Sequence, residues 1–233
     1  MGQQEMKVSL LAAPLTPAVA VLAARGCYSG DSYEDMIKKL DDSPFDDKVL
    51  MNVIDSGHLS VLEHLSFTFS IEGVSRALLA QLTRHRIASF SVESQRYVNQ
   101  GNEFKYVVPP SIESLDAKEQ EKFHAQMRII GRWYQEWIDV LGNKEDERQD
   151  ARFVLPNACA TKLVMTMNAR ELFHFFQLRC CNRAQWEIRE LANQMLALCK
   201  AEFPDVFRKA GAPCEHGACP ESSKSCGSPI RRG

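Results

Sequence analysis

The chain has 233 residues, of which 45% are hydrophobic and 25% are charged, and its formal net charge is -2. This length allows one substantial core, so we predict a single domain at 1–210, followed by a tail at 211–233 rich in Gly, Ser, Pro and Cys. The slightly acidic balance argues against wholesale electrostatic binding of nucleic acid, so an anion site must be a local cluster of side chains.

The sequence lacks the features of membrane and secreted proteins. No window approaches the roughly 18 apolar residues of a membrane span, and the first six residues do not form a signal peptide. The eight cysteines, two of them adjacent at Cys180 and Cys181, are typical of reduced thiols rather than a disulfide framework. We therefore predict a cytoplasmic protein with no membrane partner.

The first part of the chain mixes strand and helix signals. Proline after Thr16 and after Ser43 marks two helix starts, and alternation from Leu65 to Ile71 indicates a strand with one buried face. The predicted elements are a strand at 8–12, a helix from Thr16 and Pro17 to Gly26, a helix from Ser43 and Pro44 to Gly57, a strand at 65–71 and a helix at 74–83.

The second part is mainly helical. The predicted elements are strands at 95–99 and 106–108, a long helix or helix pair at 111–142, a charged helix at 145–152, a strand at 163–167, and helices at 169–178 and 183–203. An apolar stripe on the long helix is expected to form core or a subunit contact; it comprises Phe123, Met127, Ile130, Trp133, Trp137 and Leu141.

The segment from Arg84 to Tyr97 concentrates guanidinium, imidazole and hydroxyl groups and contains almost no acid. Arginine forks bind phosphate or a carbonyl edge, and hydroxyls and loop amides can donate to the remaining oxygens. We interpret this segment as an anion cradle. The alternatives are a solvated basic turn, or a non-enzymatic module that binds phosphate or nucleic acid through the same loop.

Two further groups of polar residues are candidates for binding a ligand or a metal. Asn168 is placed to cap the helix at 169–178, and a helix start is a natural site for a pyrophosphate. The alternative for the basic residues of that helix is a surface stripe, and the alternative for Arg152 is a partner for Glu145 or Glu147. The tail holds Cys214, His216, Cys219 and Cys226, but their spacing is not a usual zinc pattern. A loose reduced tail is favoured over a zinc-bearing interaction module.

The run from Arg84 to Ser94 resembles the signature of flavin-dependent thymidylate synthases, in which Arg-His-Arg is followed by seven residues and Ser. Other blocks occur in that family's order and approximate spacing, so the resemblance extends over residues 7–205. These blocks lie at 56–69, 151–156, 167–170, 178–179 and 184–188.

The resemblance implies an α+β subunit with a mainly antiparallel central sheet flanked by helices, assembled as a homotetramer with shared active sites. It also implies conversion of dUMP to dTMP for thymidylate synthesis, with methylenetetrahydrofolate as one-carbon donor, FAD as cofactor and NADPH as reductant. The residues implied for dUMP are Gln81, Arg84, Glu93, Ser94, Gln95, Arg96, Arg152 and Arg179. Those implied for FAD are His58, Ser60, Arg84, His85, Arg86, Asn168, Arg170 and His174.

Arg179 is the residue that the resemblance assigns to catalysis. A guanidinium beside N3 of uracil and its carbonyl would stabilise the deprotonated ring and make carbon 5 nucleophilic. Cys180 and Cys181 are rotated by about 100° and 200° from Arg179 on a helix, so all three cannot face one ligand. We expect Ser94 to bind rather than to attack, because no adjacent base is placed by spacing. This chain departs from many relatives at Val92, where they carry an acid, and at His174, where they carry Asn.

Overall fold

The computed structural model describes residues 2–41, 47–101 and 103–230. The chain forms two compact units. Unit 1 comprises Met1–Lys7, Ser70–Arg84 and Phe90–Val164, and unit 2 comprises Val8–Phe69, His85–Ser89 and Met165–Gly233. The boundary between 1–210 and the tail remains a prediction.

A four-stranded antiparallel sheet supplies residues to both units and confirms the α+β class. Its order is β1 (Lys7–Ala12), β2 (Ser66–Ser75), β4 (Ala160–Asn168) and β3 (Ala88–Val92). Phe67, Phe69 and Ile71 are buried, while the residues between them face outward or are half-buried, as alternation predicts for a strand with one buried face.

The helices of unit 1 follow β2 and β3 along the chain. They are α4 (Arg76–Leu82), α5 (Pro110–Glu113), α6 (Ala117–Leu141) and α7 (Glu145–Ala151), with a 3-10 turn at Arg152–Val154. Asp116 caps α6, because its carboxylate accepts the N–H groups of Lys118 and Glu119, each at 3.0 Å. Of the two alternatives predicted for 111–142, a long helix or a helix pair, the structure shows the pair α5 and α6.

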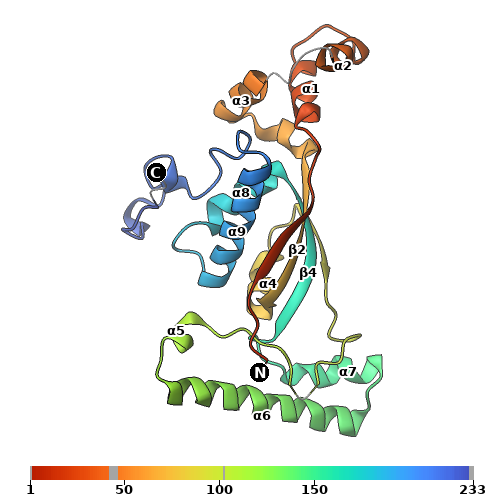
Figure 1. Cartoon of the computed structure of the whole chain (residues 1–233), viewed down its shortest axis with the longest axis vertical. Coiled ribbons are helices and arrows are strands. Elements are labelled where there is room, and N and C mark those ends of the chain that lie inside the picture. Colours follow the sequence, from red (N-terminus) through yellow and green to blue (C-terminus); the bar gives the residue numbers. More distant parts are fainter. Residues whose placement is uncertain (1, 42–46, 102, 231–233) are drawn as a thin grey trace. The chain divides into compact units, whose positions relative to one another are not determined.

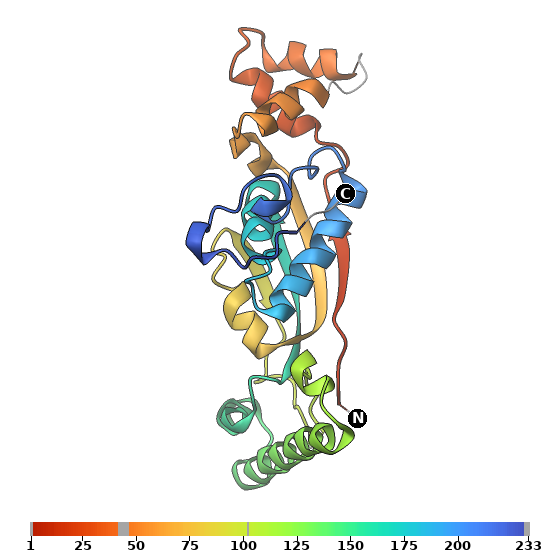
Figure 2. The same ribbon diagram turned by 90° about the vertical axis from the view of Figure 1, so that its left-hand side faces the viewer.

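Helix α6 is the long helix near the bottom of Figures 1 and 2. Its apolar stripe is only partly buried. Met127 belongs to a core cluster with Phe104, Tyr106, Val108 and Cys159. Trp133 and Trp137, further along the helix, are 51% and 48% exposed. The first half of the stripe is therefore core, and the second half is uncovered in a single chain.

The helices of unit 2 include α8 and α9, which pack side by side (Figures 1 and 2). They span Ala169–Arg179 and Trp186–Glu202, and the other helices are α1 (Ala18–Gly26), α2 (Tyr33–Asp41) and α3 (Asp47–Asp55). A 3-10 helix at Leu59–His64 leads into β2, and shorter 3-10 turns lie at Pro213–Glu215 and Ser222–Lys224. The start signal that we predicted at Ser43 and Pro44 lies outside the described residues. None of the helices among the described residues is long and apolar enough to cross a membrane.

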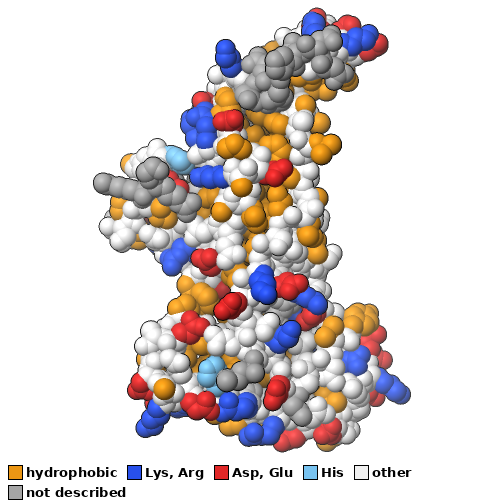
Figure 3. Space-filling view, in the orientation of Figure 1, with side chains coloured by type: hydrophobic (Ala, Val, Ile, Leu, Met, Phe, Trp, Pro, Cys, Tyr) orange, Lys and Arg blue, Asp and Glu red, His pale blue; other side chains and the backbone are white. Residues whose placement is uncertain are grey.

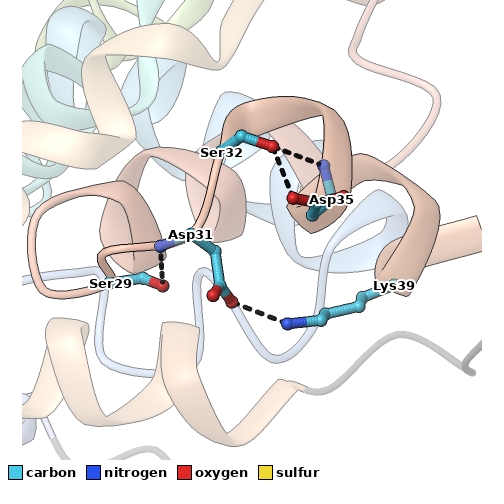
Figure 4. Close-up of polar contacts among 5 residues, drawn as sticks. All are labelled: Ser29, Asp31, Ser32, Asp35 and Lys39. Carbon is cyan, nitrogen blue, oxygen red and sulfur yellow. Dashed lines mark hydrogen bonds and ion pairs between the residues drawn. The ribbon is translucent and has the colours of Figure 1, made fainter.

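Helix α2 was not predicted from the sequence, although its start carries a local signal (Figure 4). Ser32 Oγ accepts the backbone N–H of Asp35 at 3.2 Å and donates to the Asp35 carboxylate at 2.7 Å. Asp31 pairs with Lys39 at 2.6 Å, which ties the turn before the helix to its last turn. Ser-x-x-Asp before an amphipathic stretch is the N-terminal pattern that identifies this helix.

Two predicted strands were wrong. The segment 95–99 is a turn, in which the Ser94 carbonyl accepts the Val98 N–H and the Ser94 hydroxyl accepts the Arg96 N–H. At 106–108 the described residues form isolated β-bridges at Tyr106, to Gln3 and Cys159, and one bond from the Val107 N–H to the carbonyl of Ala158, but no continuous strand. The strand of this region is β3, which lies earlier, inside the signature segment. Its half-buried Ala88, Phe90 and Val92 alternate with exposed Ser89 and Ser91, which is the period-2 pattern of a strand.

Position 73, within β2, has room only for glycine. Its φ is +71°, in the left-handed region, and a Cβ atom there would lie 2.0 Å from the carbonyl oxygen of Glu5. A side chain at position 73 would therefore clash with the backbone of the first residues of the chain.

The tail has defined contacts, although we expected a loose segment. The carboxylate of Glu221 pairs with Arg183 at 2.5 Å, and the amide of Asn182 donates to the carbonyl of Ser228 at 2.8 Å. Cys214 Sγ accepts the N–H of Ile230 at 3.4 Å. Within the described residues, no three potential ligands cluster as a metal site would require.

Candidate functional site

Helix α8 begins where the sequence placed it. The side chain of Asn168 accepts the backbone N–H of Glu171 at 2.9 Å, which confirms the predicted N-cap. A pocket of about 430 Å³ in unit 2 opens at this helix start. Its lining residues are Glu63, Ile87, Asn168, Arg170, Glu171 and His174. Three residues predicted for FAD therefore share one pocket.

Arg170 forms an ion pair with Glu63, which lies on the 3-10 helix before β2. Both side chains are about half exposed, at 54% and 47%, so the pair can exchange partners with a ligand at modest cost. Glu63 was not among the predicted site residues. It lies within the predicted block 56–69, and its carboxylate pairs with the arginine at the pocket.

Glu171, His85 and Arg179 form a hydrogen-bonded chain inside unit 2. The carboxylate of Glu171 lies 2.9 Å from His85 Nδ1, and the Nε–H of Arg179 donates to His85 Nε2 at 3.2 Å. His85 is 5% exposed and Glu171 is 7% exposed. The ring of Phe175 lies edge-on to the imidazole, with centroids 5.0 Å apart.

Burial lowers the pKa of His85 below its ordinary value of 6.5, and the nearby guanidinium of Arg179 lowers it further, while the bond to Glu171 opposes both effects. The imidazole is therefore neutral at neutral pH. Both ring nitrogens of His85 are occupied by protein groups, so a contact with FAD would have to use its backbone or ring edge. The FAD role of this residue stays a prediction.

Glu171 is the buried residue that sequence reasoning missed. Asn168 and Glu171 have the spacing of a capping box, in which the glutamate would turn back to the N-cap backbone. Its carboxylate instead accepts from His85, 86 residues away in the chain. Only the tertiary structure could show this partner.

Unit 1 holds most of the residues predicted for dUMP. Glu93 and Ser94 line a pocket of about 570 Å³, and Glu93 lies 3.6 Å from Lys162. Gln95 donates to the sulfur of Cys159 at 3.4 Å. Burial raises the pKa of the Cys159 thiol to about 11, so this cysteine is a poor nucleophile at neutral pH.

Arg96 and Arg152 have protein partners in unit 1. Arg96 pairs with Glu145 at 2.7 Å, although its buried Nε has no hydrogen-bond partner among the described residues. Arg152 donates from Nε to the carbonyl of Gln149 at 3.1 Å. Glu145 thus pairs with Arg96, rather than with Arg152 as the alternative from sequence had it.

Arg76 was also missed. It is half-buried at the start of α4, and one of its terminal nitrogens donates to the carbonyl of Glu93 at 2.8 Å. Burial lowers the pKa of its guanidinium, and its Nε has no partner among the described atoms of the chain. A buried guanidinium beside the signature turn is a further candidate for binding an anion.

The remaining residues predicted to bind FAD or dUMP are mostly exposed. His58, Ser60, Arg84 and Arg86 are exposed, and Gln81 is half-buried. Neither His58 nor Ser60 lines the pocket at the start of α8. Their assignments to FAD or dUMP stay predictions.

Comparison with known proteins identifies the family. A family model described as thymidylate synthase complementing protein matches residues 10–205. The chain belongs to the flavin-dependent thymidylate synthases. The member from Geobacter sulfurreducens is 49% identical over 227 residues, which cover 95% of this chain and 94% of that protein. The member from Nitratidesulfovibrio vulgaris is 46% identical over 246 residues, covering 100% of this chain and 99% of that protein.

A solved structure agrees with this membership of the flavin-dependent thymidylate synthases. The crystal structure of a UMP/dUMP methylase from Streptomyces cacaoi, bound with 5-Br dUMP, superposes with a TM-score of 0.72 at 25% identity. The match covers 89% of this chain and 96% of that chain. The signature segment and helix α8 lie within the residues matched by the family model, and the tail lies outside them.

Proposed function

We propose that this chain methylates dUMP to dTMP in a flavin-dependent reaction, with FAD as the flavin, methylenetetrahydrofolate as one-carbon donor and NADPH as reductant. Family membership supports the reaction, and the pocket formed by Asn168, Arg170 and His174 at the start of α8 supports the cofactor. That pocket is the observation on which the proposal for FAD rests.

The donors at this pocket fit the diphosphate of a dinucleotide cofactor. The N-terminus of α8, an 11-residue helix, carries partial positive charge, and Arg170 adds a guanidinium beside it. His174, which is exposed one turn further along, can donate to a carbonyl of the ring system. When bound, the flavin supplies the reduction that turns the transferred methylene group into a methyl group.

The nucleotide would be held by residues of unit 1. The buried Nε of Arg96 needs an acceptor, and Arg152 and Arg84 add further guanidinium groups. Arg179, in unit 2, would stabilise the pyrimidine as its N3-deprotonated anion and so raise electron density at carbon 5. In a homotetramer with shared sites, these groups need not come from one subunit.

The proposed homotetramer has support in helix α6. Trp133 and Trp137 are about half exposed on one stripe of that helix, and large exposed aromatic side chains are typical of subunit interfaces. Light scattering on the parent and on a Trp133→Glu, Trp137→Glu protein would test this. We expect the variant to dissociate.

Purification is the decisive experiment for the function. We expect a protein with the absorption of oxidised flavin that forms dTMP when dUMP, methylenetetrahydrofolate and NADPH are supplied. A colourless protein that binds polyanions with a steep salt dependence would instead support the non-enzymatic alternative. Acidic and basic side chains are interspersed on the face seen in Figure 3, which disfavours that alternative.

A further inference from the structure

The buried chain of Glu171, His85 and Arg179 has a defined direction. A carboxylate only accepts hydrogen bonds, and the Nε–H of a guanidinium only donates. The neutral imidazole between them has one donor and one acceptor. Only the tautomer with hydrogen on Nδ1 satisfies both neighbours, at 2.9 and 3.2 Å.

The direction of the Nε–H and the bond from Nε to the side-chain carbon together define the plane of a guanidinium, because the group is planar and delocalised. The bond from Arg179 Nε to His85 therefore determines where the two terminal nitrogens of Arg179 point. His85 in turn is held by Glu171 on one side and by the ring of Phe175 at 5.0 Å. The orientation of Arg179 thus depends on the carboxylate of Glu171, which acts on it through His85.

We propose that Glu171 is a positioning residue for dTMP formation, which sets the tautomer of His85 and through it the orientation of the Arg179 guanidinium. This inference rests on the proposed function, in which Arg179 activates the pyrimidine. It assigns a role to a side chain outside the sequence signature.

The tautomer can be measured without any ligand. The protein has six histidines, so selective 15N labelling gives few imidazole signals, and a His85→Gln protein identifies that of His85. In the parent, we expect a neutral ring with hydrogen on Nδ1. In Glu171→Ala, the Nδ1 partner is lost, and we expect the signal to move toward a mixture of tautomers. An unchanged signal would overturn the proposal.

Kinetics test the same link through a double-mutant cycle. Misplacement of a catalytic group by about 1 Å can cost about a hundredfold in rate, so we expect Glu171→Ala to lower the kcat for dTMP formation by about ten- to a hundredfold. Because Glu171 acts through Arg179, adding Glu171→Ala to Arg179→Ala should cause little further loss. Independent, multiplicative losses, or a parental rate for Glu171→Ala, would overturn the proposal.

Glu171→Gln is the second variant if Glu171→Ala does not fold. The amide keeps the shape of the side chain and its oxygen can accept from Nδ1–H, so we expect a loss of only a few fold and an unchanged tautomer. A hundredfold loss with the parental tautomer would contradict the proposed route. If the parent binds flavin but forms no dTMP, the proposed function fails. If the parent forms dTMP but the rate losses of Glu171→Ala and Arg179→Ala multiply, the function stands and the inference about Glu171 is wrong.

Discussion

The guanidinium of Arg96 lies 2.7 Å from the carboxylate of Glu145, on the first turn of α7. Arg148 holds the backbone of Arg96 in position, because its Nε–H donates to the carbonyl of Arg96 at 2.6 Å. A residue predicted to bind the phosphate of dUMP is therefore engaged by an acid. Binding of a phosphate at Arg96 must weaken this pair or place two anions side by side.

Replacing Glu145 by Gln should therefore strengthen dUMP binding. Both side chains of the pair are 39% exposed, and such pairs contribute about 0.2–1 kcal/mol, so we expect a gain of about 1.4- to fivefold at low salt. Calorimetric titration with dUMP measures the effect. Glu121→Gln, which removes an exposed partner of Arg128 on α6, is the matched control. Weaker binding by Glu145→Gln would mean that the carboxylate positions Arg96 for the nucleotide.

Arg152→Ala should weaken dUMP binding by about ten- to a hundredfold. Loss of one charge-assisted bond to a phosphate costs about 1.5–3 kcal/mol, and the terminal nitrogens of Arg152 make no ion pair among the described residues. Arg128→Ala removes an equal charge from α6 and should bind dUMP as the parent does. If Arg152→Ala also binds like the parent, Arg152 does not hold the nucleotide.

Ser94 should act by binding and should form no covalent bond with the nucleotide. Its hydroxyl accepts the N–H of Arg96 at 3.1 Å, and no histidine or carboxylate hydrogen-bonds to it among the bonds of the described residues. Mass spectrometry of protein quenched during turnover should find no adduct. We expect Ser94→Ala to lose dUMP affinity and to retain measurable dTMP formation; an adduct at Ser94 would contradict this role.

Arg179→Ala should bind flavin and accept hydride from NADPH, yet form dTMP about 10²- to 10³-fold more slowly, as when one preorganised donor is lost. Cys180 is fully buried and Cys181 is half-buried beside it. A Cys180→Ala, Cys181→Ala protein should therefore keep most of its activity. Rapid-quench assays of both proteins decide whether a guanidinium or a thiol activates the pyrimidine. A double cysteine variant that folds and binds flavin but has no activity would favour the thiol.

Because of His85, the free energy of unfolding should fall as the pH is lowered. Its folded pKa lies below its unfolded value of 6.5, so the unfolded chain binds more protons below that pH. The stabilising effect is complete above pH 6.5 and is lost as the pH falls through the folded pKa, by up to about 1.4 kcal/mol per pH unit. Burial is the main cause of the lowered pKa; the bond to Glu171 opposes it, and the nearby Arg179 and His174 lower the pKa further.

Urea unfolding between pH 5 and 8 measures the effect of His85. The decline in the free energy of unfolding below pH 6.5 should be shallower in His85→Gln than in the parent. Equal slopes for the two proteins would show that another group is responsible.

Local sequence signals were sufficient for most of the helices. Asn168 was recognised as the N-cap of α8, and the Thr16 and Pro17 pair correctly marked the start of α1. Strands were harder. The alternation of Ser89 and Ser91 with apolar residues does predict β3, but the basic and polar composition of the segment favoured an anion-binding loop. The turn at 95–99 is closed by hydrogen bonds to Ser94 that composition does not reveal.

Family motifs identified candidate ligands but not the contacts between them. The family resemblance gave His85 and Arg179 separate roles, whereas the structure joins them through a hydrogen bond across 94 residues. Glu63, Arg76 and Glu171 escaped notice because their partners lie far away in the chain. Long-range polar pairs of this kind have no periodicity, so a single sequence cannot reveal them.

Gly73 carries information about residues that the family model leaves out. The match begins at residue 10, yet the backbone of Glu5 occupies the place that a side chain at position 73 would need. A related sequence with a bulky residue at this position must therefore route its leading residues differently or lack them. Surveys of such sequences can use this one position, inside the shared region, to infer whether an N-terminal extension lies along β2.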